Sequence, residues 1–207
     1  MARTSGVRAS NLPPEFFNRH HLDVARELLG CALHWDGVGG IIVETEAYAA
    51  KDDPACHTFY RESARTFFES NTPGTVYAYI SYGMYWLLIV LTCDGIVLIR
   101  AIEPATGIAT MQQRRRQMAL TALCSGPGKL GQAIGLSRDD HGESLLTTTR
   151  CIRPRLADFD ETQIVSDIRV GLSTAFDRQW RFLIAGNPHV SVAPGKAWSK
   201  RRTPRRS

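Results

Sequence analysis

Residues 84–104, MYWLLIVLTCDGIVLIRAIEP, decide the fold. Two apolar runs flank Asp94-Gly95, and an Asp-Gly pair between such runs is typical of a tight β-hairpin. We therefore predict strands at 84–93 and 96–103. Because local strand-to-strand connections also dominate the rest of the chain, we expect an α+β fold, with a single mixed domain around a curved antiparallel β-sheet and flanking helices.

The predicted hairpin also implies a register. A two-residue turn places Cys93 opposite Ile96, and counting back places Ile89 opposite Arg100. A guanidinium beside an apolar strand needs an acceptor, which is either a buried carboxylate or a bound ligand. Arg100 is therefore a candidate site residue.

The remaining elements follow from hydrophobic periodicity and turn residues. We predict further strands at 31–35, 41–48, 75–82, 144–152, 163–172 and 180–193. Helices are predicted at 14–29, 107–117 and 129–136, and residues 50–74 are expected to form a long surface loop with room for one short helix. No repeat or linker divides the chain, so we expect one domain over residues 1–195 and a basic, flexible tail over 196–207.

The strand IIVETEAY, residues 41–48, carries two carboxylates on one face. With a period of two, Ile42, Glu44, Glu46 and Tyr48 share that face. Carboxylates do not pack against a dry core without a large desolvation penalty. Two interpretations remain open at this point: the face lines a wet cleft, or the strand lies at a sheet edge with a solvated face.

Two local motifs suggest cofactors but do not support them. The glycine-rich stretch 126–131, GPGKLG, has no strand–helix–strand unit around it, and Leu130 stands where a P-loop has Ser or Thr. Tight packing is our preferred interpretation, and binding of one phosphate at the helix start is the alternative. The segment 52–57, DDPACH, offers carboxylates, Cys and His, but contiguous residues seldom reach one ion. We predict neither a metal nor another cofactor.

Composition indicates a protein of the reducing cytoplasm. The five cysteines are odd in number and include no CxxC pair, which argues against a disulfide framework or a zinc knuckle. The N-terminal residues lack the apolar region of a signal peptide, and the longest apolar run, 84–93, is too short to span a bilayer. We expect no membrane partner.

The positive charge is concentrated at the C-terminus. The formal net charge is +5, and the last twelve residues hold six basic side chains: Lys196, Lys200, Arg201, Arg202, Arg205 and Arg206. Without them the chain is nearly neutral. The tail is either a solubilising end or a non-specific phosphate-binding arm, and a polyanionic partner is favoured by the overall balance.

Six stretches then occur in a specific order and spacing: ARELLG (25–30), IIVETEAY (41–48), residues 53–57, PGTVYAYISYGMY (73–85), LIRAIEP (98–104) and SGPGKL (125–130). In this combination the chain resembles the alkyladenine (3-methyladenine) DNA glycosylase family of base-excision repair, over most of residues 10–190. The resemblance implies a monofunctional enzyme that hydrolyses the N-glycosidic bond of alkylated or deaminated purines without a cofactor. It also implies double-stranded DNA with damaged purines as the partner, a monomer, and association with the nucleoid.

The resemblance assigns catalytic and base-binding roles by position. Glu46 matches the general base that activates a water for attack on C1′ of a flipped nucleotide, and Arg100 matches an arginine near that water. The residues that match the surroundings of the extruded base are Tyr48, His57, Tyr79, Ile89 and Leu98. Stacking on such rings is expected to offset the unstacking of the base, and a cationic alkylated purine would also gain a cation–π attraction.

The resemblance assigns DNA contacts in the same way. Tyr82 matches the wedge that enters the minor groove and fills the gap left by the base, and Met84 lies beside it against the duplex. Arg65 and Lys129 are expected to contact the DNA backbone.

The chain departs from the family pattern at two places. Ile89 stands where the family usually has an asparagine at the pocket edge, which predicts weaker polar discrimination between purines and a smaller penalty for bulky or alkylated bases. The 62–74 loop lacks the family's usual arginine-asparagine and Met-Phe elements.

Two rival functions are a non-catalytic module that binds damaged or single-stranded DNA and a hydrolase of free nucleosides.

Overall fold

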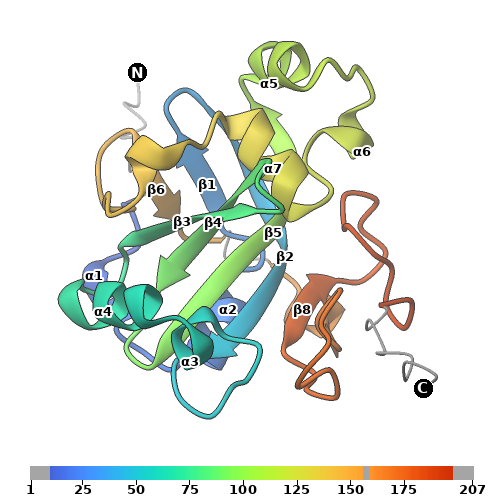
Figure 1. Cartoon of the computed structure of the whole chain (residues 1–207). Helices are drawn as coiled ribbons and strands as arrows, with labels where there is room; N and C mark the ends of the chain where they lie inside the picture. The colour runs from blue at the N-terminus through green and yellow to red at the C-terminus, as the bar shows by residue number, and fades with distance from the viewer. Residues whose placement is uncertain (1–9, 156–158, 198–207) are drawn as a thin grey trace, which may run out of the picture.

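The computed structural model describes residues 10–155 and 159–197. Eight strands in these ranges form one antiparallel sheet: β1 (Ala32–Trp35), β2 (Val38–Ala49), β3 (Val76–Ser81), β4 (Tyr85–Leu91), β5 (Gly95–Thr106), β6 (Arg150–Arg153), β7 (Ile164–Asp167) and β8 (Arg181–Ile184). The main path of the sheet is β3-β4-β5-β2-β1-β6, and β8 joins β2 to β7. The predicted α+β class is confirmed (Figure 1).

The long strand β2 lies in the interior of the sheet. It pairs with β5 along most of its length, with β1 at its beginning, and with β8 through Glu44, Thr45 and Glu46. The edge-strand interpretation of residues 41–48 is therefore wrong. The β2–β5 register shifts on both sides of Glu44. Such bulges re-aim side chains, and here they flank Glu44, two residues before Glu46.

The β4–β5 hairpin exists, but its turn lies one residue earlier than predicted. Thr92 N–H donates to Gly95 O at 2.9 Å, so Cys93 and Asp94 form the two-residue turn. Ile89 consequently pairs with Leu98 and not with Arg100. Gly95 is the first residue of β5. The position requires glycine, because a Cβ here would lie 2.3 Å from Tyr48 O. The glycine serves close packing against β2 and not the turn.

Seven α-helices flank the described part of the sheet: α1 (Pro14–Phe17), α2 (His21–Glu27), α3 (His57–Tyr60), α4 (Glu62–Ser70), α5 (Ile108–Arg115), α6 (Leu120–Leu123) and α7 (Pro127–Ile134). Two short 3₁₀ helices follow, η1 (Arg138–Asp140) and η2 (Glu161–Gln163). Figure 1 shows α5, α6 and α7 near one end of the sheet, and α3 and α4 near the other. None of the helices within 10–155 and 159–197 combines the length and apolar character of a membrane span.

Several predicted boundaries were wrong. The helix predicted at 14–29 is two helices, because Asn18 leaves the helical region and His20 is extended, with its side chain accepting from Leu22 N–H. The 50–74 segment contains two short helices, α3 and α4. The last three predicted strands are much shorter than 144–152, 163–172 and 180–193, since only β6, β7 and β8 pair within them.

Alternation along β4 divides the core into two clusters. Leu88 and Val90 face the main cluster, which α2 and α7 help to cover. Ile89 and Leu91 face a smaller cluster on the other side of the sheet, where Ala64 of α4 packs. The packing interpretation of the glycine-rich stretch is supported, because a Cβ on Gly131 would lie 1.9 Å from Trp86 O. The smaller cluster borders the candidate site.

Candidate active site

A cavity of about 510 Å³ opens on the side of the smaller cluster. Strands β2 to β5, helix α3 and the segment 170–172 supply its walls. The structure brings together in its lining all the residues predicted to be catalytic or to contact the base, with the predicted wedge as well: Glu46, Tyr48, His57, Tyr79, Tyr82, Ile89, Leu98 and Arg100. The volume falls in the range of small-molecule sites.

The Glu46 carboxylate is fully buried and has a partner on each oxygen. Val170 N–H donates to Oε1 at 2.7 Å, and Tyr48 O–H donates to Oε2 at 2.7 Å. Arg100 Nη1 lies 3.1 Å from the same Oε2. These contacts fix the orientation of the carboxylate at the cavity wall. A carboxylate so held is suited to accept a proton from a water placed in the cavity.

Glu44 does not line the cavity, so the wet-cleft prediction holds for Glu46 and Tyr48 only. Glu44 Oε1 accepts from Arg100 Nε and from Arg181 Nη1, each at 2.9 Å. Ser191 donates its N–H to Oε2 at 2.6 Å and its hydroxyl to Oε1 at 2.8 Å. Burial alone would raise the pKa of Glu44, but Arg100, Ser191 and Arg181 lower it below its usual value.

Arg100 joins the two carboxylates. Burial favours the neutral form of its guanidinium, but the charges of Glu46 and Glu44 outweigh burial and raise the pKa of Arg100 further above its ordinary value. Arg100 is therefore charged at any working pH. The sequence prediction that this arginine needs a buried carboxylate or a ligand is borne out by two carboxylates.

Two aromatic side chains meet on the α3 side of the cavity. The ring centroids of His57 and Tyr79 lie 4.0 Å apart, at an interplanar angle of 56°. Burial, aided by the charge of Arg61, lowers the pKa of His57 to about 4, so the imidazole is neutral near pH 7. Its Nδ1 lies 3.3 Å from the hydroxyl of Tyr77. A neutral ring beside a phenol suits stacking with a flat ligand.

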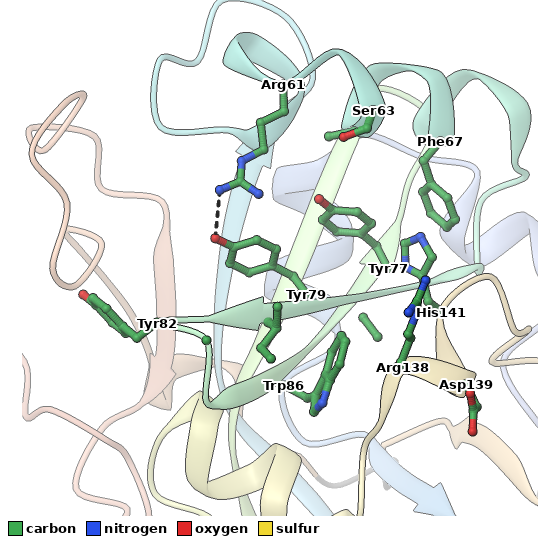
Figure 2. Close-up of a pocket in the computed structure, with 14 residues that line it drawn as sticks. Arg61, Ser63, Phe67, Tyr77, Tyr79, Tyr82, Trp86, Arg138, Asp139 and His141 are labelled. Atoms are coloured by element: carbon green, nitrogen blue, oxygen red, sulfur yellow. Dashed lines mark hydrogen bonds between the residues drawn. The ribbon is translucent and has the colours of Figure 1, made fainter.

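Arg61 is a site neighbour that sequence reasoning missed. Figure 2 shows it reaching from the start of α4 toward Tyr79, to whose hydroxyl Nη2 donates at 3.2 Å. Its guanidinium carbon also lies 5.1 Å from the centroid of the Tyr79 ring. Both residues line a second groove, of about 730 Å³, which shares Tyr79 and Tyr82 with the cavity. The sequence gives no pattern that separates Arg61 from other exposed arginines.

The tip of the β3–β4 hairpin carries the predicted wedge. Tyr82 and Gly83 have φ values of 52° and 69°, and Met84 N–H donates to Ser81 O at 3.1 Å, which closes a tight turn. Tyr82 and Met84 are 75% and 68% exposed. In Figure 2, Tyr82 projects from the hairpin away from Trp86. Tyr82 and Gly83 thus form the bend together, and the φ of Gly83 is one that glycine adopts readily.

The other predicted DNA contacts lie outside the cavity. Arg65 Nη1 donates to the carbonyls of Thr58 and Phe59, at 2.9 and 3.1 Å, and so joins α4 to α3. Lys129 is exposed near the start of α7, with Nζ 3.2 Å from Ser125 Oγ. Their contact with DNA stays a prediction. The basic tail beyond residue 197 lies outside the described residues.

The segment 52–57, for which we predicted no metal, supplies the acidic partner of a buried ion pair. Asp53 is buried and binds both terminal nitrogens of Arg169, at 2.6 and 3.0 Å. In the part of the chain that the structure describes, one group of side chains has metal-ligand geometry: His20, His21 and Asp94. The Asp94 carboxylate already lies 3.4 Å from His20 Nε2 and 3.1 Å from His21 Nδ1, and none of the three residues lines the cavity.

Sequence reasoning also missed the segment that closes the cavity behind Glu46. The chain leaves β7 after Asp167 and places Arg169 and Val170 beside β2. Val170 is 124 residues from Glu46, and Arg169 is 116 residues from Asp53. No local spacing signals such contacts.

The fold and the cavity together define a class: an α+β protein in which a buried carboxylate stands beside aromatic walls that suit a flat ligand. Comparison with known proteins makes this specific. The chain belongs to the methylpurine-DNA glycosylase family, whose model matches residues 15–188. This confirms the family resemblance inferred from the sequence motifs.

Individual relatives agree over most of their length. A protein of Rhizobium etli is 45% identical over 177 residues, which cover 85% of this chain and 86% of the relative. A protein of Rhodopseudomonas palustris strain HaA2 is 40% identical over 195 residues, covering 92% and 95%. Both bear the name "Putative 3-methyladenine DNA glycosylase".

Proposed function

We propose that this chain is a monofunctional DNA glycosylase that removes alkylated or deaminated purines from duplex DNA, as a monomer acting on the nucleoid. Family membership and the names of the relatives support the enzyme class. The observation that carries the chemistry is the buried Glu46 carboxylate, which is oriented by three partners at the wall of an aromatic cavity.

The cavity receives the damaged base after it has left the duplex. A base inside the stack is out of reach of Glu46, so the nucleotide must rotate outward, which costs a few kcal/mol and less for a damaged pair. The rings of Tyr48, His57 and Tyr79 line the cavity and return roughly 1–3 kcal/mol per stacked base. Stacking therefore offsets most of the cost of extrusion.

Hydrolysis then needs one activated water. Glu46 accepts a proton from this water as its oxygen bonds to C1′ of the sugar, and the C1′–N bond breaks with its electron pair leaving on the base. A purine alkylated at N3 or N7 is cationic, and its positive charge makes it a good leaving group. Arg100 holds Oε2 of Glu46 from the protein side and orients the carboxylate toward the reacting centre.

The hairpin tip supplies the contact with the duplex. Tyr82 fills the space left by the extruded base, and Met84 lies against the neighbouring pairs, because both side chains project from the tip and are mostly exposed. Arg65, Lys129 and the basic tail contact phosphates. A free nucleoside needs none of these groups, which disfavours a nucleoside hydrolase.

A base-release assay tests the proposal. The substrates are duplexes that each carry one defined lesion (3-methyladenine, 7-methylguanine, hypoxanthine or an etheno adduct), an undamaged duplex, and the matching free nucleosides. We expect release of the free base from at least one damaged duplex, with little from nucleosides. Binding without release would favour the non-catalytic module, and equal release from nucleosides would favour the nucleoside hydrolase.

A further inference from the structure

A buried arginine lies against the outer side of one wall of the cavity. The guanidinium carbon of Arg169 is 4.5 Å from the centroid of the Tyr48 ring. Tyr48 lines the cavity, whereas Arg169 is fully buried and does not line it. The phenol ring therefore separates the guanidinium from whatever the cavity binds.

The position of this cation is fixed. Its two terminal nitrogens bind both oxygens of Asp53, at 2.6 and 3.0 Å, and also donate to the carbonyls of Ala47 and Ala175, at 3.0 and 3.2 Å. Asp53 thus bonds to the two terminal nitrogens of the guanidinium, while the central carbon lies over the Tyr48 ring. The negative charge of Asp53 therefore lies beside the guanidinium of Arg169, at ion-pair distance from it, and does not coincide with the positive charge.

A fixed cation behind a ring changes what the front of the ring prefers. An aromatic face attracts a cation through its negative quadrupole, and this attraction weakens when a second cation already draws the π electrons to the other face. The two cations also repel each other through a low-dielectric wall that screens poorly. A neutral purine stacked on the same ring experiences neither effect.

We propose that Arg169 is a specificity-determining residue that lowers the preference of the cavity for cationic alkylated purines over neutral ones such as hypoxanthine, an inference that rests on the proposed glycosylase function. Asp53 opposes it by neutralising the guanidinium. The Asp53–Arg169 pair thereby sets the balance between two kinds of damaged base from behind Tyr48, without touching the base.

Two substitutions in the pair give shifts of opposite sign. The readout is the ratio of single-turnover release rates for 7-methylguanine and hypoxanthine, in otherwise identical duplexes. Arg169→Met removes the cation and is expected to raise the ratio about three- to tenfold. Asp53→Asn keeps the cation but removes its counter-charge, and is expected to lower the ratio. Thermal unfolding of each variant confirms that it is folded.

Arg19→Met is the matched control. Arg19 also lies over an aromatic ring, 4.6 Å from the centroid of Phe16, and pairs with Glu27 at 2.8 Å, but it does not line the cavity. Its ratio should equal that of the wild type. If Arg169→Met is unfolded, the downward shift in Asp53→Asn still decides the matter.

A structural role alone would slow both substrates equally in both variants. An unchanged ratio, or shifts of the same sign in the two variants, would overturn the inference while leaving the glycosylase function intact. Absence of release by the wild-type chain from every damaged duplex of the lesion panel would instead contradict the proposed function.

Discussion

The Tyr48 hydroxyl donates a 2.7 Å hydrogen bond to Oε2 of Glu46, so one wall of the cavity is tied directly to the candidate general base. Burial and the adjacent Glu46 raise the pKa of Tyr48 well above its ordinary value, which keeps the phenol protonated and able to donate. One side chain therefore offers its ring to the base and its hydroxyl to the carboxylate.

Tyr48→Phe separates these two contributions. The ring remains for stacking, but Glu46 loses a charge-assisted hydrogen bond worth roughly 1.5–3 kcal/mol. We expect single-turnover base release to slow by about tenfold or more, with little change in duplex affinity. Tyr85→Phe, at a half-exposed position outside the cavity lining, is the control and should leave the rate unchanged. Equal rates for Tyr48→Phe and wild type would contradict this role.

Glu44→Gln tests the buried network beneath the site. The substitution leaves Arg100 and Arg181 without the carboxylate that both bind, and breaking a buried ion pair from one side costs about 3–5 kcal/mol. Urea unfolding at pH 7 should show a loss of this size. Glu103→Gln, at an exposed position bonded to Asn187, should cost less than about 0.5 kcal/mol. Equal losses in the two variants would refute the network.

The lowered pKa of His57 implies that the stability of the protein depends on pH. Burial lowers its pKa in the folded state to about 4, from about 6.5 in the unfolded chain. Between these values the unfolded state binds more protons, so stability is fully present above pH 6.5 and falls as the pH drops toward 4. In His57→Phe this loss of stability on going from pH 7 to pH 5, on the order of 2 kcal/mol, disappears. Urea unfolding at pH 7 and pH 5 should show a smaller difference for the variant, and an identical difference would contradict the burial argument.

Ile89→Asn tests selectivity at the pocket edge. Ile89 lines the cavity and is 4% exposed, and isoleucine neither donates nor accepts a hydrogen bond. Asparagine should sharpen discrimination between adenine- and guanine-derived lesions, which the lesion panel measures as changed relative release rates. A buried amide also costs roughly 1–3 kcal/mol of stability. Ile89→Leu is the volume-matched control, and an unchanged profile in Ile89→Asn would contradict the role of this position.

The strands that carry most of the candidate site could be predicted from the sequence pattern, and the family resemblance assigned roles to the residues on them. The alternation in IIVETEAY and the apolar runs around Asp94 identify β2, β4 and β5, and these strands carry Glu46, Tyr48 and Arg100. The turn was misplaced by one residue because Asp94-Gly95 looks like a turn pair, whereas Gly95 is needed for close approach to Tyr48 O. That contact joins two strands and is invisible in the hairpin alone.

The supporting contacts could not be predicted for the same reason. Glu44 and Glu46 are indistinguishable by alternation along β2. The family resemblance singles out Glu46, but the physical reason, that Arg181 and Ser191 bind Glu44 from more than 130 residues away, appears only in the structure. Asp53 looks like a loop carboxylate until Arg169 is placed beside it. Tertiary packing, which local spacing does not encode, decides the role of each acid.

The most direct test of the account compares wild type with Glu46→Gln on a duplex that carries a single 7-methylguanine. Glutamine has nearly the same shape, but its amide nitrogen cannot accept from the donors that hold one of the two carboxylate oxygens, and it cannot act as a general base toward water. We predict that binding to the damaged duplex persists while single-turnover release of the base falls by at least about 100-fold, the lower range of general-base contributions. Release by Glu46→Gln at the wild-type rate would contradict the account.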